Sequence, residues 1–309
     1  MPVQVCSIQT LARRGWPDFD VCIVDEFHDM HKAQIHMMEK WDNLTYIGLS
    51  ATPYTKGLGR YWQSLVVGAT TKQLIEQGYL SDFQVYAPPP PDLKGVPTTA
   101  GDYNLRKLAE RVDRSNPVGD VIKTWDRYGE NNPTICFAVN IEHSKHIASE
   151  FQKSGVNAVH VDCYTDRDET LNIIKRYKSG EIKILTCVDK LTKGFDAPLT
   201  GTLIMARPTK SLTTHMQQIG RALRIAPGKE DAIILDHGGN VERHGFPTDE
   251  TLPVTLDTRE KGEKKEKATP EKKPKSCPKC HYVKEVGVHV CPKCGFEPKR
   301  NNEVEHEQG

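Results

Sequence analysis

Two adjacent carboxylates, Asp25 and Glu26, follow a short apolar run at residues 21–24, and His28 stands two positions beyond Glu26. If this run is a strand of a parallel sheet, the carboxylates lie at its carboxyl end, where such sheets bind ligands. One carboxylate can hold Mg²⁺ through its oxygens, and the other can orient or deprotonate a water that attacks a phosphoryl group. An acidic turn without a metal fits these residues equally well.

The next β-branched run, residues 45–49, leads into a Ser-Ala-Thr-Pro sequence that begins at Ser50. The hydroxyls of Ser50 and Thr52, at the end of a neighbouring strand, could link a nucleotide site to a ligand bound across a cleft. Ser and Thr before Pro also commonly form a simple turn. This segment alone is therefore a weak indication.

A Gly-Phe-Asp-Ala-Pro segment, which contains Gly194 and Asp196, follows the apolar run at residues 182–187. Gly194 permits a ligand to approach the backbone closely, and Asp196 could accept a hydrogen bond from a ribose or from a basic side chain. An ordinary loop has the same composition.

Three polar residues, Gln217, Arg221 and Arg224, are spaced so that a helix would present them on one face. Two guanidinium groups presented together can stabilise charge on a transferring γ-phosphoryl group. A solvated basic helix face is the common alternative.

Four cysteines near the end of the sequence have the spacing of a metal site. They form two Cys-Pro-Lys-Cys knuckles with ten residues between them. Four thiolates in this pattern suit a closed, structural Zn²⁺ site, whereas a redox pair would need only one knuckle. The intervening segment is too short to bury much core, so metal binding should supply most of the folding free energy. The predicted ligands are Cys277, Cys280, Cys291 and Cys294.

The alternation of apolar runs and helix-like stretches predicts an α/β fold with two lobes, each built on a parallel sheet. Strand and helix patterns alternate regularly from residue 118 to 235, whereas the first lobe has too few strands for a complete sheet. Its predicted strands are residues 3–8, 21–24 and 45–49. The predicted organisation is a partial first lobe at 1–86, a connector with four consecutive prolines at 87–115, a second lobe at 116–248, a flexible Lys/Glu-rich linker at 249–275 and a zinc ribbon at 276–300.

The composition limits the possible classes of function. The formal net charge is +1, so a nucleic-acid partner must be argued from local sites and not from a basic excess. No apolar run reaches the about 18 residues of a transmembrane helix, and the first residues lack a signal-peptide pattern, which predicts a cytoplasmic protein. The five remaining cysteines are expected to be small buried residues in a reducing compartment; they are Cys6, Cys22, Cys136, Cys163 and Cys187.

The order of the motifs is more specific than any one of them. Asp-Glu-x-His, Ser-Ala-Thr, Gly-x-Asp-x-Pro and Gln-x-x-Gly-Arg-x-x-Arg follow one another as in superfamily 2 helicases. The segments at residues 7–14 and 236–245, together with the four cysteines, narrow this likeness. The sequence resembles the RadD-like DNA repair helicases of bacteria and their phage relatives over nearly its whole length. The resemblance implies a fold of two RecA-like lobes. It also implies a protein located in the cytoplasm of a bacterial cell or a phage-infected host.

The resemblance implies a role for each matching residue. Asp25 would hold the Mg²⁺ that accompanies ATP, Glu26 would activate water, and His28 completes the catalytic motif. Ser50 and Thr52 would couple hydrolysis to strand movement. Gly194, Asp196 and Gln217 would lie on the face that meets the nucleotide or the nucleic acid. Arg221 and Arg224 would contact the γ-phosphate. One departure is Phe27, where the family usually has a small residue, and it puts the fine geometry around the carboxylates in question.

A superfamily 2 motor also needs a GxxxxGK[ST] loop to hold the phosphates. The sequence contains none before Asp25, and the segment at residues 227–230 lacks the hydroxyl residue. The expectation is a truncated or split motor, with a separate polypeptide supplying the P-loop half. The expected function is an ATP-dependent helicase or translocase that acts on single-stranded or branched DNA in repair, recombination or replication.

A non-hydrolysing DNA- or protein-binding module built on a truncated helicase is the alternative. A nuclease related to restriction subunits has little support, since no further cluster of carboxylates and Lys is evident.

Overall fold

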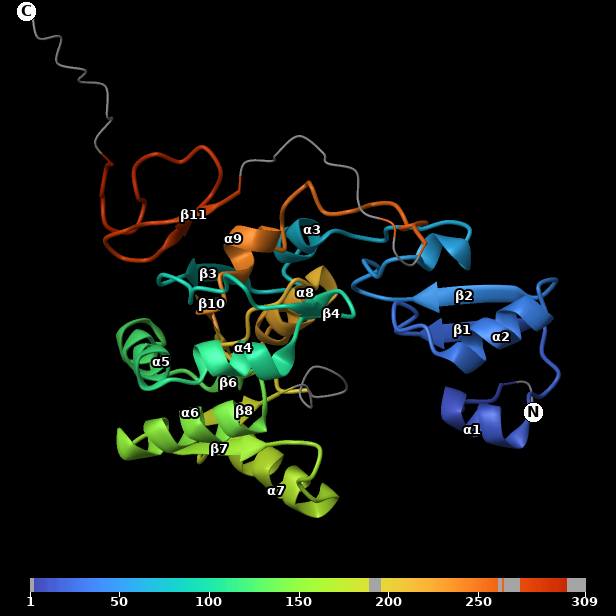
Figure 1. Ribbon diagram of the computed structural model, residues 1–309, viewed down its shortest axis with the longest axis horizontal. Coiled ribbons are helices and arrows are strands. Elements are labelled where there is room, and N and C mark those ends of the chain that lie inside the picture. The colour runs from blue at the N-terminus through green and yellow to red at the C-terminus, as the bar shows by residue number, and fades with distance from the viewer. Residues whose placement is uncertain (1–2, 189–195, 261–262, 264–272, 299–309) are drawn as a thin grey trace, which may run out of the picture. The chain divides into compact units, whose positions relative to one another are not determined.

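The computed structural model describes residues 3–188, 196–260, 263 and 273–298, and it confirms an α/β fold with parallel sheets (Figure 1). The chain divides into two compact units. The first comprises Met1–Ala69 and Glu250–Pro270, and the second comprises Thr70–Asp249 and Glu271–Gly309.

The first unit is built on a two-stranded parallel sheet, β1–β2, with a register that pairs Asp25 with Leu49. The predicted strand at residues 3–8 is wrong, because a helix begins at Ile8. Ser7 caps this helix, with its Oγ accepting a hydrogen bond from the backbone N–H of Thr10. The elements are α1 (Ile8–Arg14), β1 (Val21–Asp25), α2 (Lys32–Lys40), β2 (Thr45–Leu49) and the 3₁₀ helix η1 (Leu58–Arg60).

One face of this sheet is covered and the other is open. Phe27, Met37 and Trp62 belong to a buried cluster on the covered side. On the opposite side, apolar side chains from alternate positions of both strands are 45–64% exposed. Parallel sheets are normally covered on both faces, so this face is unusual for its class. The exposed residues are Val21, Ile23, Ile47 and Leu49.

Phe27 occupies space that a glycine leaves free. A Cβ atom added to Gly48 would lie 2.7 Å from Cδ1 of Phe27 and 2.9 Å from the Trp62 ring. The Phe27 and Trp62 ring centroids are 4.7 Å apart, and Phe27 is buried. The bulky residue at this position of the motif is therefore accommodated in the core of the first unit.

Residues 250–260 pack against the first unit, although the sequence predicts a flexible linker for 249–275. The Gly59 N–H donates to the carbonyl of Asp257 at 2.8 Å, and Leu256 contacts the buried cluster of this unit. An apolar side chain and a backbone hydrogen bond thus help to hold a polar segment, together with polar contacts such as that of Arg60 with Glu260. Most of the remainder of the predicted linker lies outside the described residues.

The second unit is built on a six-stranded sheet, with the order β3–β10–β9–β6–β8–β7 and every pairing parallel. The predicted strand and helix positions after residue 118 agree closely with the structure. The strands are β3 (Asp82–Tyr86), β6 (Thr134–Phe137), β7 (Ala158–Val161), β8 (Ile184–Cys187), β9 (Thr202–Met205) and β10 (Asp231–Asp236). The helices are α3 (Thr71–Glu76), α4 (Leu105–Val112), α5 (Ser115–Tyr128), α6 (Ile141–Lys153), α7 (Arg167–Lys178), α8 (Leu212–Ala222) and α9 (Asn240–His244).

Helices cover both faces of this sheet, as Figure 1 shows. Side chains of α7 and α8, such as Tyr177 and Ile219, pack with Phe137 on one face. Side chains of α5 and α6, such as Trp125 and Phe151, pack on the other. This double coverage explains why the interior strands β6, β8 and β9 are buried at every position and read as continuous apolar runs in the sequence.

Residues 70–86 belong to the second unit, whereas the sequence-based boundary placed them in the first lobe. The reason is that β3 forms an edge of the six-stranded sheet, where Asp82 pairs with Asp231 of β10. A strand that joins a sheet so far along the chain cannot be assigned from local pattern alone.

The proline-rich connector also packs on the second unit. It contains a short hairpin of β4 (Thr98–Thr99) and β5 (Asp102–Tyr103), followed by α4. The Asp102 carboxylate accepts hydrogen bonds from the Thr209 hydroxyl at 2.6 Å and from the Lys210 N–H at 2.7 Å. These bonds hold the hairpin to the segment that follows β9.

The four-cysteine segment, with β11 (Lys275–Ser276) and β12 (Val283–Lys284), contacts the end of β3. The Ala87 N–H donates to the His281 carbonyl at 2.8 Å. Tyr86 stacks on Tyr128 at a centroid distance of 4.2 Å and meets the ring of Tyr282 edge-on at 5.7 Å. The segment is therefore attached to an edge of the six-stranded sheet.

The contact between Phe27 and Gly48 gives a test of the first unit's core. We expect Gly48→Ala to lower the free energy of unfolding by about 1–3 kcal/mol, because the added methyl group overlaps two rings. In a Phe27→Ala background the same substitution should cost much less. Urea unfolding followed by tryptophan fluorescence measures both, since Trp16, Trp41 and Trp62 lie in this unit.

Gly68→Ala is the matched control, because a Cβ atom at Gly68 would meet nothing within 4 Å. An equal penalty for Gly48→Ala in both backgrounds would contradict the packing described.

Candidate active site and metal centre

The parallel pairing of β1 with β2 brings the first two motifs together. The strands end side by side, and the Phe27 N–H donates to the Leu49 carbonyl at 3.1 Å. Beyond this bond, Nδ1 of His28 lies 2.8 Å from Oγ of Ser50. The Asp-Glu-x-His and Ser-Ala-Thr segments are thus in direct contact.

His28 lies between the two motifs. Its Nδ1 is also 3.3 Å from Oε2 of Glu26, and Ser50 Oγ accepts the Thr52 N–H at 2.9 Å. The His28 ring is buried, whereas the Glu26 side chain is 44% exposed. A continuous set of polar contacts therefore runs from an accessible carboxylate through a buried imidazole to the second motif.

The backbone at Glu26 is in a conformation that residues with a Cβ rarely adopt. Its φ is +52°, in the left-handed region. The Glu26 N–H donates to Oδ1 of Asp25 at 3.0 Å, and its carbonyl accepts the Asp29 N–H at 2.9 Å. Such local strain is typical of sites that must aim a side chain, and here it turns Glu26 away from the strand direction.

Thr52 carries an unsatisfied hydroxyl. Its side chain is buried, and in the described part of the chain Oγ1 has no hydrogen-bond partner. Buried hydroxyls are nearly always paired, so this atom is available to a group that binds or moves there.

In the second unit, Arg224 does not share the helix face predicted for it. Helix α8 ends at Ala222 with Leu223 as its C-cap, so only Gln217 and Arg221 keep the one-turn spacing. The backbone of Arg224 instead forms an isolated antiparallel β-bridge with Leu80, which lies just before β3.

Arg224 and Asp196, two residues singled out from different motifs, form an ion pair through Nη1 and Oδ1. The basic partner foreseen for Asp196 is therefore Arg224. Gly194 lies outside the described residues.

Lys229 belongs to the segment that imitates a P-loop in sequence. Its Nζ donates to the carbonyls of Ala222 and Arg224 at the end of α8. Burial lowers the pKa of this ammonium group to about 8. Lys229 thus satisfies free carbonyls at a helix C-terminus.

The four cysteines converge as a metal site requires. The sulfur atoms of Cys277, Cys280, Cys291 and Cys294 all lie within 4.8 Å of one another. Three of these side chains are buried, and Cys294 is partly buried. Sulfur atoms at this spacing fit around a single tetrahedral ion.

The thiols of the four-cysteine cluster differ in acidity. Burial raises the pKa of Cys277, but the N–H groups of Cys280 and Lys279 outweigh it and the result is a pKa of about 7. Burial and the neighbouring thiols raise the pKa of Cys280 to about 12. A cation bound among the four sulfur atoms would stabilise their thiolate forms.

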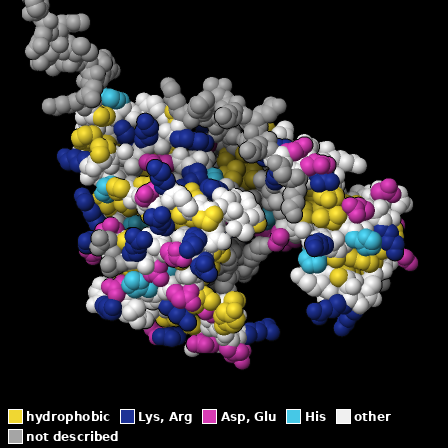
Figure 2. Space-filling model, in the orientation of Figure 1, with side chains coloured by type: hydrophobic (Ala, Val, Ile, Leu, Met, Phe, Trp, Pro, Cys, Tyr) yellow, Lys and Arg dark blue, Asp and Glu magenta, His cyan; other side chains and the backbone are white. Residues whose placement is uncertain are grey.

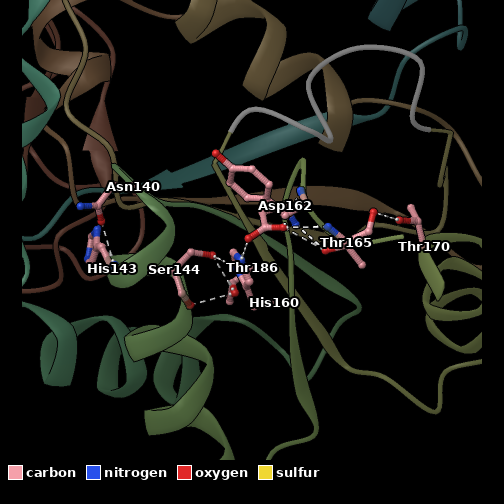
Figure 3. A network of polar contacts seen from close by, with 9 residues as sticks. Asn140, His143, Ser144, His160, Asp162, Thr165, Thr170 and Thr186 are labelled. Atoms are coloured by element: carbon pink, nitrogen blue, oxygen red, sulfur yellow. Dashed lines mark hydrogen bonds and ion pairs between the residues drawn. The ribbon is translucent and has the colours of Figure 1, made fainter. Parts of the chain in front are cut away.

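A polar network that sequence reasoning missed lies inside the second unit (Figure 3). Ser144 Oγ is 2.6 Å from Nδ1 of His160 and 3.0 Å from Oγ1 of Thr186, and His160 Nε2 is 3.0 Å from Oδ2 of Asp162. The hydrogen bond from His160, with those from Tyr164 and Thr165, lowers the pKa of Asp162 to about 2.

This Ser–His–Asp order resembles a hydrolase triad, but Ser144 is fully buried and cannot attack a substrate. The network instead ties α6 to β7 and β8. No local signal could have revealed it, because its members are brought together by the sheet.

No helix in the described ranges is both long enough and apolar enough to cross a membrane.

Comparison with known proteins gives the motifs a family context. Residues 118–226 match the model of the helicase conserved C-terminal domain. A 51.5 kDa protein of a Lactococcus phage is 30% identical over 279 residues, which cover 89% of this chain and 61% of the phage protein. A yeast protein from Saccharomyces cerevisiae, named "Putative ATP-dependent helicase IRC3", is 27% identical over 255 residues, covering 77% of this chain and 37% of the relative.

Among solved structures, a fragment of a Vibrio vulnificus protein described as a "putative HsdR subunit of a type I restriction enzyme" superimposes with a TM-score of 0.61 at 22% identity. The match covers 82% of this chain and 49% of that one, and it establishes a shared fold. The chain spans less than two thirds of the length of these relatives. Residues 118–226 form a helicase C-terminal domain, and the chain is related to superfamily 2 helicases.

Proposed function

We propose that this chain is the larger part of an ATP-dependent superfamily 2 helicase or translocase that acts on DNA. The observation that carries the proposal is the contact of His28 with both Glu26 and Ser50, which joins the acidic motif to the Ser-Ala-Thr motif at the ends of two adjacent strands. An acidic turn without function would need neither the left-handed backbone at Glu26 nor a buried imidazole beside it.

In this proposal Asp25 and Glu26 have separate tasks. Asp25 is exposed at the end of β1, and only its Oδ1 accepts the neighbouring N–H, so Oδ2 fits a ligand of Mg²⁺ bound with ATP. Bound Mg²⁺ would neutralise charge on the phosphates. Glu26 accepts a proton from the attacking water or orients it, while His28 fixes the position of the carboxylate.

The same contacts provide a route for coupling. A change at Glu26 reaches Ser50 through His28, and Ser50 in turn holds the Thr52 N–H. The unpaired hydroxyl of Thr52 supports a role for this residue in responding to bound nucleotide or nucleic acid.

On the second unit, Arg221 and Arg224 would contact the γ-phosphate, with Gln217 one turn before Arg221 on α8. Asp196 pairs with Arg224 and would hold the guanidinium until nucleotide binds. Gly194 would let the loop backbone approach the nucleotide or nucleic acid.

The combination of a helicase motor with a four-cysteine module supports three finer parts of the proposal. These are DNA as the substrate, a role in repair, recombination or replication, and membership of the RadD-like group. The related phage protein supports action in a bacterial cell infected by phage. Phosphate contacts and stacking would make the binding insensitive to sequence.

A P-loop would be supplied by a segment that covers the open face of the first sheet. That face exposes Ile23 and Ile47 although it belongs to a parallel sheet. The segment could be part of the same polypeptide or of a separate one. A non-hydrolysing DNA- or protein-binding module remains the second candidate, because the residues present include no P-loop.

ATP hydrolysis separates these two candidates. We expect the chain joined to a P-loop-bearing segment of a relative to show DNA-stimulated ATPase activity, and Glu26→Gln to lower it by at least about a hundredfold, because the general base is lost. Phosphate release with and without single-stranded DNA measures both. Glu39→Gln, an exposed carboxylate on α2, is the matched control and should leave the rate unchanged. A completed chain that binds DNA without turnover would favour the binding module.

The open sheet face gives a second test. Ile23→Lys should weaken association with a separately expressed P-loop segment by about ten- to a hundredfold, because a charge replaces a side chain that would be buried. Calorimetric titration measures the affinity. Val66→Lys is the control, since Val66 is 88% exposed and lies outside both strands. Equal affinities for both variants would show that the segment docks elsewhere.

The four-cysteine site should hold one Zn²⁺ per chain. Inductively coupled plasma mass spectrometry measures the zinc content. We expect Cys291→Ser to abolish tight binding and to speed hydrogen exchange at the Ala87 N–H, which bonds to the module through His281. Cys163→Ser is the control, because Cys163 is exposed, contrary to the burial expected from the sequence. Full zinc content and unchanged Ala87 protection in Cys291→Ser would refute the site.

A further inference from the structure

A cavity of about 180 Å³ lies within the second unit and has no part in the function proposed above. Its walls include Ala206, just beyond β9, and His237, just beyond β10. The carboxyl ends of parallel strands are where open α/β sheets bind ligands. The position therefore suits a binding site better than a packing defect.

Most of the lining is apolar and rigid. Pro88, Pro89 and Pro91 of the connector form one side, and Val121 of α5 contributes to another. Proline side chains are rigid and lose little entropy when a planar group lies against them. An apolar protein cavity of about 150 Å³ is known to hold a benzene ring, so this one has room for a single planar ring system.

His143 provides a hydrogen-bond donor inside this lining. It lies in the first turn of α6, where Asn140 caps the helix (Figure 3). Its side chain is 2% exposed, and Nδ1 accepts the Val139 N–H at 3.3 Å, which assigns the proton to Nε2. Burial lowers the pKa of this imidazole to about 4, so the ring is neutral. Among the described residues Nε2–H has no hydrogen-bond partner.

His237 and Asp120 add two further polar groups. Nε2 of His237 lacks a hydrogen-bond partner within the described ranges, but the atom is buried and so does not face the open space of the cavity. Burial lowers the pKa of His237 to about 3, so this ring is neutral too. Asp120 lines the opening with a side chain that is 61% exposed and lies 3.8 Å from Lys123 Nζ.

The chemistry of these groups selects the ligand. No Lys or Arg side chain is among the described residues that line the cavity, which disfavours a phosphate. The neutral imidazole of His143 and the carboxylate of Asp120 offer a donor and acceptors to the edge of a flat ring. A nucleobase edge carries both donors and acceptors, whereas an indole ring carries one donor and a phenyl ring none.

We propose that this cavity binds one unstacked nucleobase of a single strand, held between the connector prolines and α5 and hydrogen-bonded by His143 and Asp120. The proposal rests on the proposed function, because it assumes a nucleic-acid ligand. Lys123, at the rim, would meet the adjoining phosphate. The cavity would thereby retain a strand on the second unit independently of the nucleotide site.

The probe is 2-aminopurine, as the free deoxyriboside and as a single base within an oligothymidine, with binding followed by fluorescence. We expect Ala206→Leu, which fills the cavity, to weaken binding of the deoxyriboside at least about tenfold. Asp120→Asn, at an exposed side chain that cannot affect the core, should weaken it as well. Asp126→Asn, an exposed carboxylate on the same helix, is the matched control and should change nothing.

Separate measurements distinguish failure of this proposal from failure of the proposed function. Anisotropy of a labelled oligothymidine reports strand binding as a whole. The cavity proposal would be overturned, and the helicase proposal would stand, if the protein bound the strand but not the deoxyriboside. The same holds if Ala206→Leu and Asp120→Asn left deoxyriboside binding unchanged. Binding of N-acetyltryptophanamide in place of the deoxyriboside would overturn it in favour of a protein side chain.

Discussion

The pairing of parallel strands is the constraint on which the rest of this structure depends. In the first unit, the register of β1 with β2 places Asp25 beside Leu49, and only then can His28 reach Ser50 at 2.8 Å. In the second unit, the same kind of pairing aligns the carboxyl ends of β9 and β10, from which Ala206 and His237 enter the cavity. The backbone hydrogen bonds between the strands fix their register. The fixed register in turn brings the residues that follow neighbouring strands to the same edge of the sheet.

Parallel pairing also demands that both sheet faces be covered, and the two units meet this demand differently. The six-stranded sheet has α5 and α6 on one face and α7 and α8 on the other, so its interior strands β6, β8 and β9 are buried at every position. The two-stranded sheet is covered on one face, where Phe27 fits over Gly48, and leaves Ile23 and Ile47 exposed on the other. Full burial of a large aliphatic side chain stabilises by roughly 1.5–3 kcal/mol. The four side chains on the open face are already about half buried, so a covering segment would gain about half of that from each.

Much of the fold and part of the site follow from sequence, and the division has a physical basis. Elements after residue 118 are predicted well because doubly covered strands give continuous apolar runs, and the convergence of the four cysteines follows from their spacing. Three features could not be predicted. The pairing of β3 with β10, the end of α8 before Arg224, and the contact of His160 with Ser144 all depend on tertiary partners far away in the chain or on a helix end set by its surroundings.

The four-cysteine module is a small segment that packs against the edge of the larger sheet, and each stabilises the other. Strand β3 lies at an edge of the six-stranded sheet, and an uncovered edge is open to pairing with other chains. The module covers the end of that edge through the bond from Ala87 to His281 and through the rings of Tyr86 and Tyr282. Because the module has little core of its own, a bound metal ion would contribute much of its order. Metal binding would therefore stabilise more than the module, since it also fixes the end of β3, from which the cavity prolines follow directly.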